Sequence, residues 1–342
     1  MNRVVAAMHA VEETGSGQLT IAAAPEAIQA IARIAPAPTW LFALAAGAGA
    51  MALAVIFGVE HLMAAILIFF SAAAGAILRR VLAKVSRNIF LQPFCAALLA
   101  GIIGALAVRW QWSSSLRLAA VCPCMVLVPG PAVLNGALDL IRGRMHLGAA
   151  RLLYAGLVTL AISVGLILGL VVFGASFPVD PPVRVMPLWQ DVIAAGVAVA
   201  AYSVFFSTPR NMLGWPIVVG ALAHALRWWS LTKLDQSAAM GALIACVVVS
   251  LILTPVARHW HMPFAAIGFA SVVSMIPGVF LFRTAAGLVQ LAGGSRVSPE
   301  LLSATVADGT TAITIILAIS FGLIVPKLMI DYLGERLMQA KS

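Results

Sequence analysis

The chain has 342 residues, of which 62% are hydrophobic and 10% are charged. This composition excludes an ordinary soluble globular domain, and a lipid bilayer is the solvent that explains it. The net charge of +9 does not indicate a nucleic-acid partner, because the Lys and Arg residues are spread over short connections between apolar runs. We therefore expect an all-α integral membrane protein that binds no nucleic acid.

Residues 1–40 are predicted to form a short N-terminal amphipathic, interfacial segment. Positions 12–17 are polar, and Pro25 precedes apolar residues at helical spacing. Proline is favoured in the first turn of a helix, and a short helix with one apolar face lies flat at a membrane interface. The segment is too short to be an enzyme domain.

Apolar runs of spanning length fill the rest of the chain. A helix needs about 20 residues to cross a hydrocarbon core of about 30 Å. With a cytoplasmic N-terminus, the segments on that side hold two thirds of the 21 Lys and Arg residues, so both termini are expected in the cytoplasm. The predicted transmembrane helices, about ten, are 41–59, 62–79, 89–108, 116–134, 149–173, 189–207, 213–229, 238–256, 264–281 and 303–325.

The second half of the chain repeats short motifs of the first. Leu78-Arg79 recurs as Leu226-Arg227 after 148 residues, and Val128-Pro129-Gly130 recurs as Ile276-Pro277-Gly278 at the same offset. Ordered matches of this kind favour a duplication over chance similarity between apolar helices.

The duplication divides the membrane part into a first repeat, residues 41–180, and a second repeat, residues 188–333. Each repeat contains five predicted helices. An odd number of crossings makes the two repeats enter the membrane from opposite sides, which is the inverted-repeat architecture of secondary transporters. The fold prediction is therefore two inverted five-helix repeats.

The two Pro-Gly pairs lie inside predicted helices four and nine. Proline removes a backbone donor and glycine tolerates non-helical backbone, so we expect both helices to break there. Each break would present a half-helix N-terminus whose partial positive charge suits a carboxylate. An ordinary proline kink is the alternative. Candidate substrate-binding residues are therefore Pro129, Gly130, Pro277 and Gly278.

Polar residues follow each break inside the predicted membrane region. They are Asn135 and Asp139 in the first repeat and Arg283 in the second. Asp308 lies in predicted helix ten, and its counterpart 157 residues earlier is Arg151. Ionisable groups inside a membrane are costly and mark functional sites. Arg151 and Asp308 are expected to pair with each other, as a structural ion pair or a gate, or to bind the two ends of a substrate. The alternative is that Asp308 lies at the membrane interface.

Asp139 and Asp308 are also the candidates for proton coupling, because few of the twelve carboxylates are expected in the membrane. The sequence shows no nucleotide-binding, hydrolase or zinc-ligand pattern. His259 and His261 lack a nearby acidic or thiol partner and are interpreted as interfacial anchors. We expect no enzyme activity, no cofactor and no metal site.

Several of these motifs together resemble the threonine/serine exporter family. The stretch from Leu127 to Gly130, followed by Asn135, Asp139 and the Gly148–Arg151 segment, is similar to that family's first membrane domain. Residues 205–210, 220–221 and 274–278 are similar to its second membrane domain. The resemblance extends over roughly residues 17–333 and rests on the order of several short motifs.

The resemblance implies proton-driven export of threonine and serine across the bacterial cytoplasmic (inner) membrane. Some relatives divide the two halves between two chains and are associated with dicarboxylate export, so a succinate-type exporter is an alternative. A non-transporting membrane assembly subunit is another. Amino-acid-exporting members generally carry a longer hydrophilic N-terminal region than residues 1–40. We expect a transporter in the lipid bilayer that moves a small-molecule substrate by alternating access. A homo-oligomer is compatible with the sequence.

Overall fold

The computed structural model describes residues 2–59, 61–110, 116–175, 186–260, 262–293 and 298–339, and all regular secondary structure in these ranges is helical. The first half of the chain contains α1 (Asn2–Gly15), α2 (Ala24–Arg33), α3 (Thr39–Ile56), α4 (Leu62–Val85), α5 (Leu91–Arg109), α6 (Leu116–Met125), α7 (Gly130–Ile141) and α8 (Met145–Val171). The second half contains α9 (Leu188–Phe205), α10 (Gly214–Lys233), α11 (Ala238–His259), α12 (Phe264–Val272), α13 (Gly278–Ala292) and α14 (Pro299–Gln339). Short 3₁₀ turns lie at Ile21–Ala23, Arg210–Met212 and Val273–Met275.

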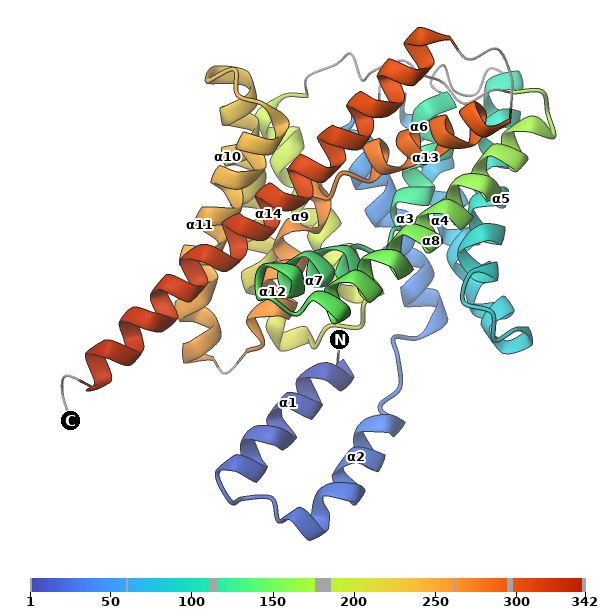
Figure 1. The fold of residues 1–342 in the computed structure, drawn as a ribbon. Helices are drawn as coiled ribbons and strands as arrows, with labels where there is room; N and C mark the ends of the chain where they lie inside the picture. Colours follow the sequence, from blue (N-terminus) through green and yellow to red (C-terminus); the bar gives the residue numbers. More distant parts are fainter. Residues whose placement is uncertain are drawn as a thin grey trace.

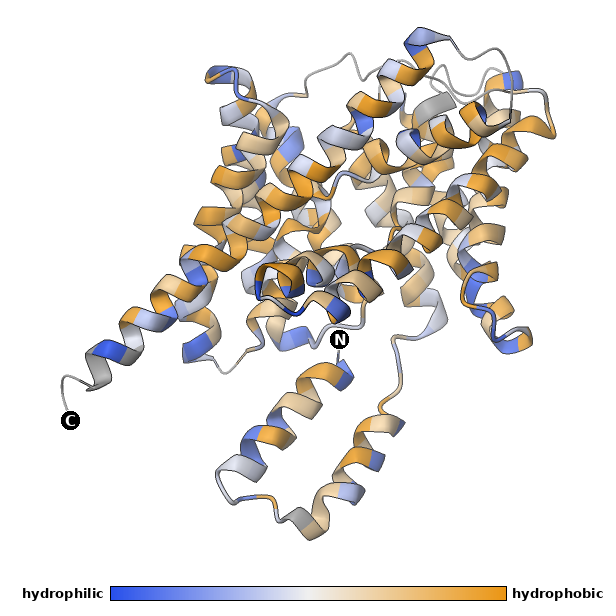
Figure 2. Cartoon of the chain, in the orientation of Figure 1, coloured by the Kyte–Doolittle hydropathy of each residue, from blue (hydrophilic) through white to orange (hydrophobic). Residues whose placement is uncertain are grey.

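The helix bundle has the composition of a membrane-embedded protein. In the described ranges, seven helices are long and apolar enough to cross a membrane, or nine if each of two bent helix pairs is one span. Large apolar side chains such as Phe70, Leu153 and Val218 are exposed on the outside of the bundle, where hydrophobic residues cover the helices (Figure 2). An apolar surface of this extent is suited to lipid. The chain is therefore a multi-pass α-helical membrane protein.

The predicted count of ten spans is not confirmed. The difference lies in α10, which coincides with the predicted span 213–229 but is not among the helices apolar enough to cross a membrane. Its sequence includes His224 and Arg227, which lower its hydropathy. The other predicted spans all coincide with long helices or bent helix pairs.

Both Pro-Gly pairs interrupt a helix, as predicted. The axis bends by 59° between α6 and α7 and by 64° between the helix that ends at Met275 and α13. Pro129 and Pro277 adopt nearly the same backbone angles, with φ −77° in both and ψ 56° and 53°. The glycine N–H then donates to the carbonyl two residues back, at 2.8 Å in Gly130 and 2.7 Å in Gly278. A mere kink would keep one helix through the proline, whereas here a new helix begins at each glycine.

The same pairs of helices pack together in both halves of the chain. In the first half α5 packs against α8 and α4 against α5, and in the second half α11 packs against α14 and α10 against α11. The halves meet most extensively where α3 contacts α9 (Figure 1). Small residues allow close approach, since a Cβ added at Gly169 in α8 would lie 3.0 Å from the Cα of Gly101 in α5.

The N-terminal segment contains two helices where a single short amphipathic helix was predicted. They form the hairpin α1–α2, which projects from one end of the bundle (Figure 1). Pro25 lies in the first turn of α2, as predicted. One hydrogen bond holds the hairpin to the bundle, because Asn2 N–H donates to Ser207 O at 2.9 Å. Two more join its helices, since Arg3 donates from Nε and Nη2 to Ile34 O at 3.1 and 3.0 Å.

The last helix, α14, runs well past the predicted end at residue 325. Pro326 lies inside it without ending it, which membrane helices tolerate. Beyond this proline, Asp331 pairs with Lys327 one turn earlier and with Arg258 of α11 at 2.7 Å. The C-terminal end of α14 lies on the same side of the bundle as α1 (Figure 1).

Candidate functional site

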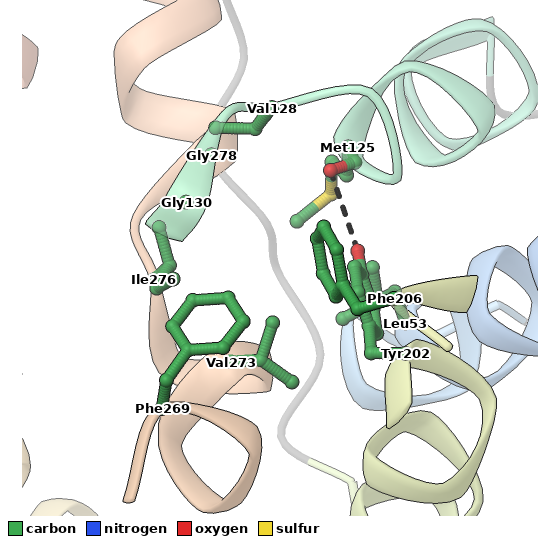
Figure 3. Close-up of a pocket in the computed structure, with 10 residues that line it drawn as sticks. All are labelled: Leu53, Met125, Val128, Gly130, Tyr202, Phe206, Phe269, Val273, Ile276 and Gly278. Carbon is green, nitrogen blue, oxygen red and sulfur yellow. Dashed lines mark hydrogen bonds between the residues drawn. The ribbon is translucent and has the colours of Figure 1, made fainter. Parts of the chain in front are cut away.

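The two helix breaks face each other at the centre of the bundle. A Cβ added at Gly130 would lie 2.8 Å from Cδ1 of Ile276, and one added at Gly278 would lie 3.5 Å from Cε of Met125. Between the breaks is a cavity of about 20 Å³ (Figure 3). A space of this size holds about one water molecule. The breaks are thus in contact, without room for an organic substrate between them.

Aromatic side chains close this small cavity. Tyr202 and Phe206 line it from the end of α9 and Phe269 lines it from α12 (Figure 3). The Tyr202 hydroxyl donates to the carbonyl of Met125 at 3.3 Å. Met125 is the last residue of α6, where carbonyls lose their helical partners. Tyr202 therefore stabilises the broken end of α6 from the other half of the chain.

A much larger cavity, of about 250 Å³, lies on the other side of the first break. It shares Val128 and Phe206 with the small cavity, so these two side chains separate the two spaces. A volume of this order accommodates a small organic molecule. Its lining residues are Arg79, Ile89, Pro93, Val126, Leu127, Val128, Pro129, Pro131, Ala132, Tyr154, Val158, Phe205 and Phe206.

The first turn of α7 has its backbone donors already engaged. Ala132 N–H and Val133 N–H both donate to Pro129 O, at 2.9 and 3.1 Å, and Gly130 N–H donates to Val128 O. Pro131 has no N–H. The break was predicted to present a positive helix end to a carboxylate. The positive helix end is present at α7, but any further hydrogen-bond donor has to come from a side chain.

The predicted charged residues form two ion pairs, one in each half of the chain. Asp139 in α7 accepts a hydrogen bond from Arg151 in α8, and Arg144 lies 3.8 Å from its other oxygen. Arg283 in α13 pairs with Asp308 in α14 at 2.8 Å. Each ion pair therefore links the half-helix after a break to the next long helix.

This arrangement differs from the predicted relation between Arg151 and Asp308. The two residues correspond at the sequence offset of 157, but each is paired inside its own half. Asp308 is buried in α14. None of the paired residues lines either cavity. Asn135, half-buried on α7, belongs to neither an ion pair nor these cavities.

Comparison with known proteins decides the family. A family model described as "Putative threonine/serine exporter" matches residues 1–173, and a second, "Threonine/Serine exporter, ThrE", matches residues 191–329. The chain belongs to the threonine/serine exporter family. The two matches meet between α8 and α9, so each covers one half of this exporter-family bundle.

A curated relative is similar to about a third of the chain. The "Probable succinate transporter subunit YjjP" of Escherichia coli (strain K12) is 29% identical over 114 residues, which are 32% of this chain and 43% of the relative. The chain thus spans less than half the length of that relative. No solved structure matches the chain.

Two groups of buried polar residues were missed by sequence reasoning. Arg79, noted only as a repeat marker, lines the larger cavity of this exporter-family protein. Asp191 in α9 and His224 in α10 form a buried pair, with His224 Nδ1 3.0 Å from an Asp191 oxygen. Their position inside apolar helices was a readable signal, because buried ionisable groups are rare in membranes. The described residues contain no cluster of three metal-ligating side chains.

Proposed function

We propose that this chain is a secondary active exporter of a small amino acid, threonine or serine, that uses the proton gradient across the bacterial inner membrane. The observation that carries the proposal is the matched pair of helix breaks in an exporter-family bundle, with a substrate-sized cavity beside the first. Broken helices inside membrane proteins serve as substrate and ion sites, because irregular backbone is tolerated only where it is buried or lines a cavity.

The proposed architecture is two inverted five-helix repeats that move against each other. Repetition of the helix contacts and the near-identical backbone angles at Pro129 and Pro277 support it. Each half-helix also contacts the other half, since α7 packs against α14 and α13 packs against α8. A rocking motion between the halves would therefore alter both breaks together, which alternating access requires.

In this proposal the four break residues shape the site, and the two ion pairs act as clasps. Asp139–Arg151 holds α7 to α8, and Arg283–Asp308 holds α13 to α14. Protonation of Asp139 or Asp308 would remove the charge that attracts the arginine, so a proton could release a clasp. Asn135, on α7 between the break and Asp139, adds polarity on the substrate path.

The cytoplasmic side is proposed to be the side of α1 and of the end of α14. The larger cavity is lined by residues from the end of α4, the start of α5 and the end of α9. These helix ends lie near the N-terminal segment, because Arg80 of α4 donates to Ala37 O at 2.6 Å and Asn2 donates to Ser207 after α9. The structure then represents a state with its cavity towards the cytoplasm, where an exporter loads its substrate.

A second candidate is export of a dicarboxylate such as succinate. It is favoured by the name of the relative from Escherichia coli, a probable succinate transporter subunit, and by Arg79, the cation that lines the larger cavity. The word "subunit" in that name also allows an assembly role, and a homo-oligomer is compatible with the lipid-facing surface.

The test is flux in vesicles that contain the purified full-length chain. Threonine and serine should move only when a proton gradient is imposed, and succinate should not. Succinate flux without threonine flux would replace the substrate class. Absence of both fluxes would overturn the transporter proposal and favour the assembly role.

A further inference from the structure

Arg79 is a shielded cation with unpaired hydrogen-bond donors. Its Nε and Nη1 atoms are buried and have no hydrogen-bond partner among the described residues. The neighbouring Arg80 is fully occupied, donating to Ala37 O at 2.6 Å and Thr39 Oγ1 at 3.1 Å and stacking on Phe42 at 4.3 Å. A buried guanidinium without partners is costly and needs an anion to offset its desolvation. The preference for basic residues at the cytoplasmic ends of membrane helices explains Arg80 but not the shielded position of Arg79.

Among the described residues that line the cavity around Arg79, none supplies an anion. Arg79 is the one charged side chain among the residues that line the larger cavity, and Tyr154 carries the other polar group. The Phe205 ring centroid lies 5.6 Å from the guanidinium carbon, which fixes the side chain by a cation–π contact. Pro129, at the first break, lines the same cavity. The described lining therefore leaves the place of a counter-charge to Arg79 open to a ligand.

The repeat counterpart of Arg79 in the second half lies near a carboxylate of the protein. Arg227, 148 residues after Arg79, interacts electrostatically with Asp191, whose hydrogen-bonded partner is His224 at 3.0 Å. A carboxylate is thus present in the surroundings of Arg227, whereas the described lining of the cavity beside Arg79 contains none.

We propose that Arg79 binds the carboxylate of the transported substrate in the cavity beside Pro129. A guanidinium presents two parallel N–H donors that match the two oxygens of a carboxylate. The N-terminus of α7 adds its positive dipole end, and the apolar lining suits a short aliphatic body. The inference rests on the proposed function and deepens it, because it assigns the ligand contact that the engaged backbone of α7 does not provide.

The experiment measures binding by calorimetry to the purified full-length chain in detergent. The probes are threonine and threoninol, in which an alcohol replaces the carboxylate, and succinate with succinamide. Wild type should bind the carboxylate member of one pair more tightly than its carboxylate-free partner. Arg79→Gln should weaken that carboxylate by roughly tenfold to a hundredfold, the range of a charge-assisted hydrogen bond, and should not weaken the carboxylate-free partner. Arg79→Lys should lie between the two.

Lys84→Gln is the matched control, because it removes an equal charge from the exposed last turn of the same helix. It should leave all four affinities unchanged. If wild type binds a carboxylate and Arg79→Gln binds it equally, this inference fails while the transport proposal stands. If Arg79→Gln weakens the carboxylate and carboxylate-free probes alike, the role is structural and the inference fails. If wild type binds neither carboxylate, both proposals fail.

Discussion

Each helix break is followed by an ion pair, Asp139–Arg151 or Arg283–Asp308, which forms a joint between two helices. The two joints carry their charges in opposite order. In the first half the half-helix α7 carries the acid and the long helix carries the base, and in the second half α13 carries the base. The side chain of Arg151 is 42% exposed, whereas those of Arg283 and Asp308 are 10% and 11% exposed. Water screens an exposed pair and leaves a buried one strong, so the second joint should be the tighter.

The largest expected effect is at this buried joint. Asp308→Asn leaves the Arg283 guanidinium buried without a counter-charge, which should lower the free energy of unfolding by about 3–5 kcal/mol. Unfolding in detergent, followed by circular dichroism, measures the loss. Exchanging the two residues, Arg283→Asp with Asp308→Arg, should recover part of it. An Asp308→Asn variant as stable as wild type would mean that the second joint is not tighter than the first.

The repeat-related arginines give the next contrast. In the ligand-free protein, Arg227→Gln removes the cation near buried Asp191 and should cost about 1–3 kcal/mol. Arg79→Gln removes a cation that has no protein partner and should leave the melting temperature unchanged or raised. Thermal unfolding of both variants without substrate compares them directly. Equal losses would show that Arg79 is held by the protein itself.

The two glycines after the prolines should differ although their backbones agree. A Cβ at Gly130 would press on Cδ1 of Ile276 at 2.8 Å, whereas at Gly278 it would meet ordinary contacts at 3.5 Å. Gly130→Ala should therefore cost about 1–3 kcal/mol through overpacking, and Gly278→Ala should cost less than about 0.5 kcal/mol. Paired melting curves test this. Gly130→Ala combined with Ile276→Val should recover stability, and failure to do so would point away from this contact.

The breaks and most helix starts could be predicted because they depend on local chemistry. Pro and Gly act on their own turn of backbone, so Pro129-Gly130 and Pro277-Gly278 were readable from sequence. Helix ends were less readable. The predicted span 62–79 begins where α4 begins but stops before Val85, because the charged last turn resembles a loop. The predicted span 303–325 likewise stops short of the end of α14 at Gln339, because Pro326 and the charged residues after it do not end the helix.

The site itself depends on contacts between distant segments and was only partly predictable. Arg151 and Asp308 correspond in the repeat, yet their partners are set by which helices pack side by side. Arg79 looked like one of several basic residues at the end of a span. Its candidate role in binding depends on Phe205 and Pro129, which line the same cavity but are distant from Arg79 in the sequence. No periodicity in the sequence carries that information.

A small effect is expected at the exposed joint of the first half. Arg151→Gln removes a half-exposed partner of Asp139, and Arg144, 3.8 Å from the same carboxylate, can take over part of its role. The expected loss is therefore below about 1 kcal/mol, and it should shrink further in high salt because exposed pairs are screened. Removing both arginines should cost more than the sum of the single changes, because buried Asp139 would then keep no cation. Unfolding of the three variants at low and high salt measures this, and an Arg151→Gln loss as large as that of Asp308→Asn would show that exposure does not set the strength of the two joints.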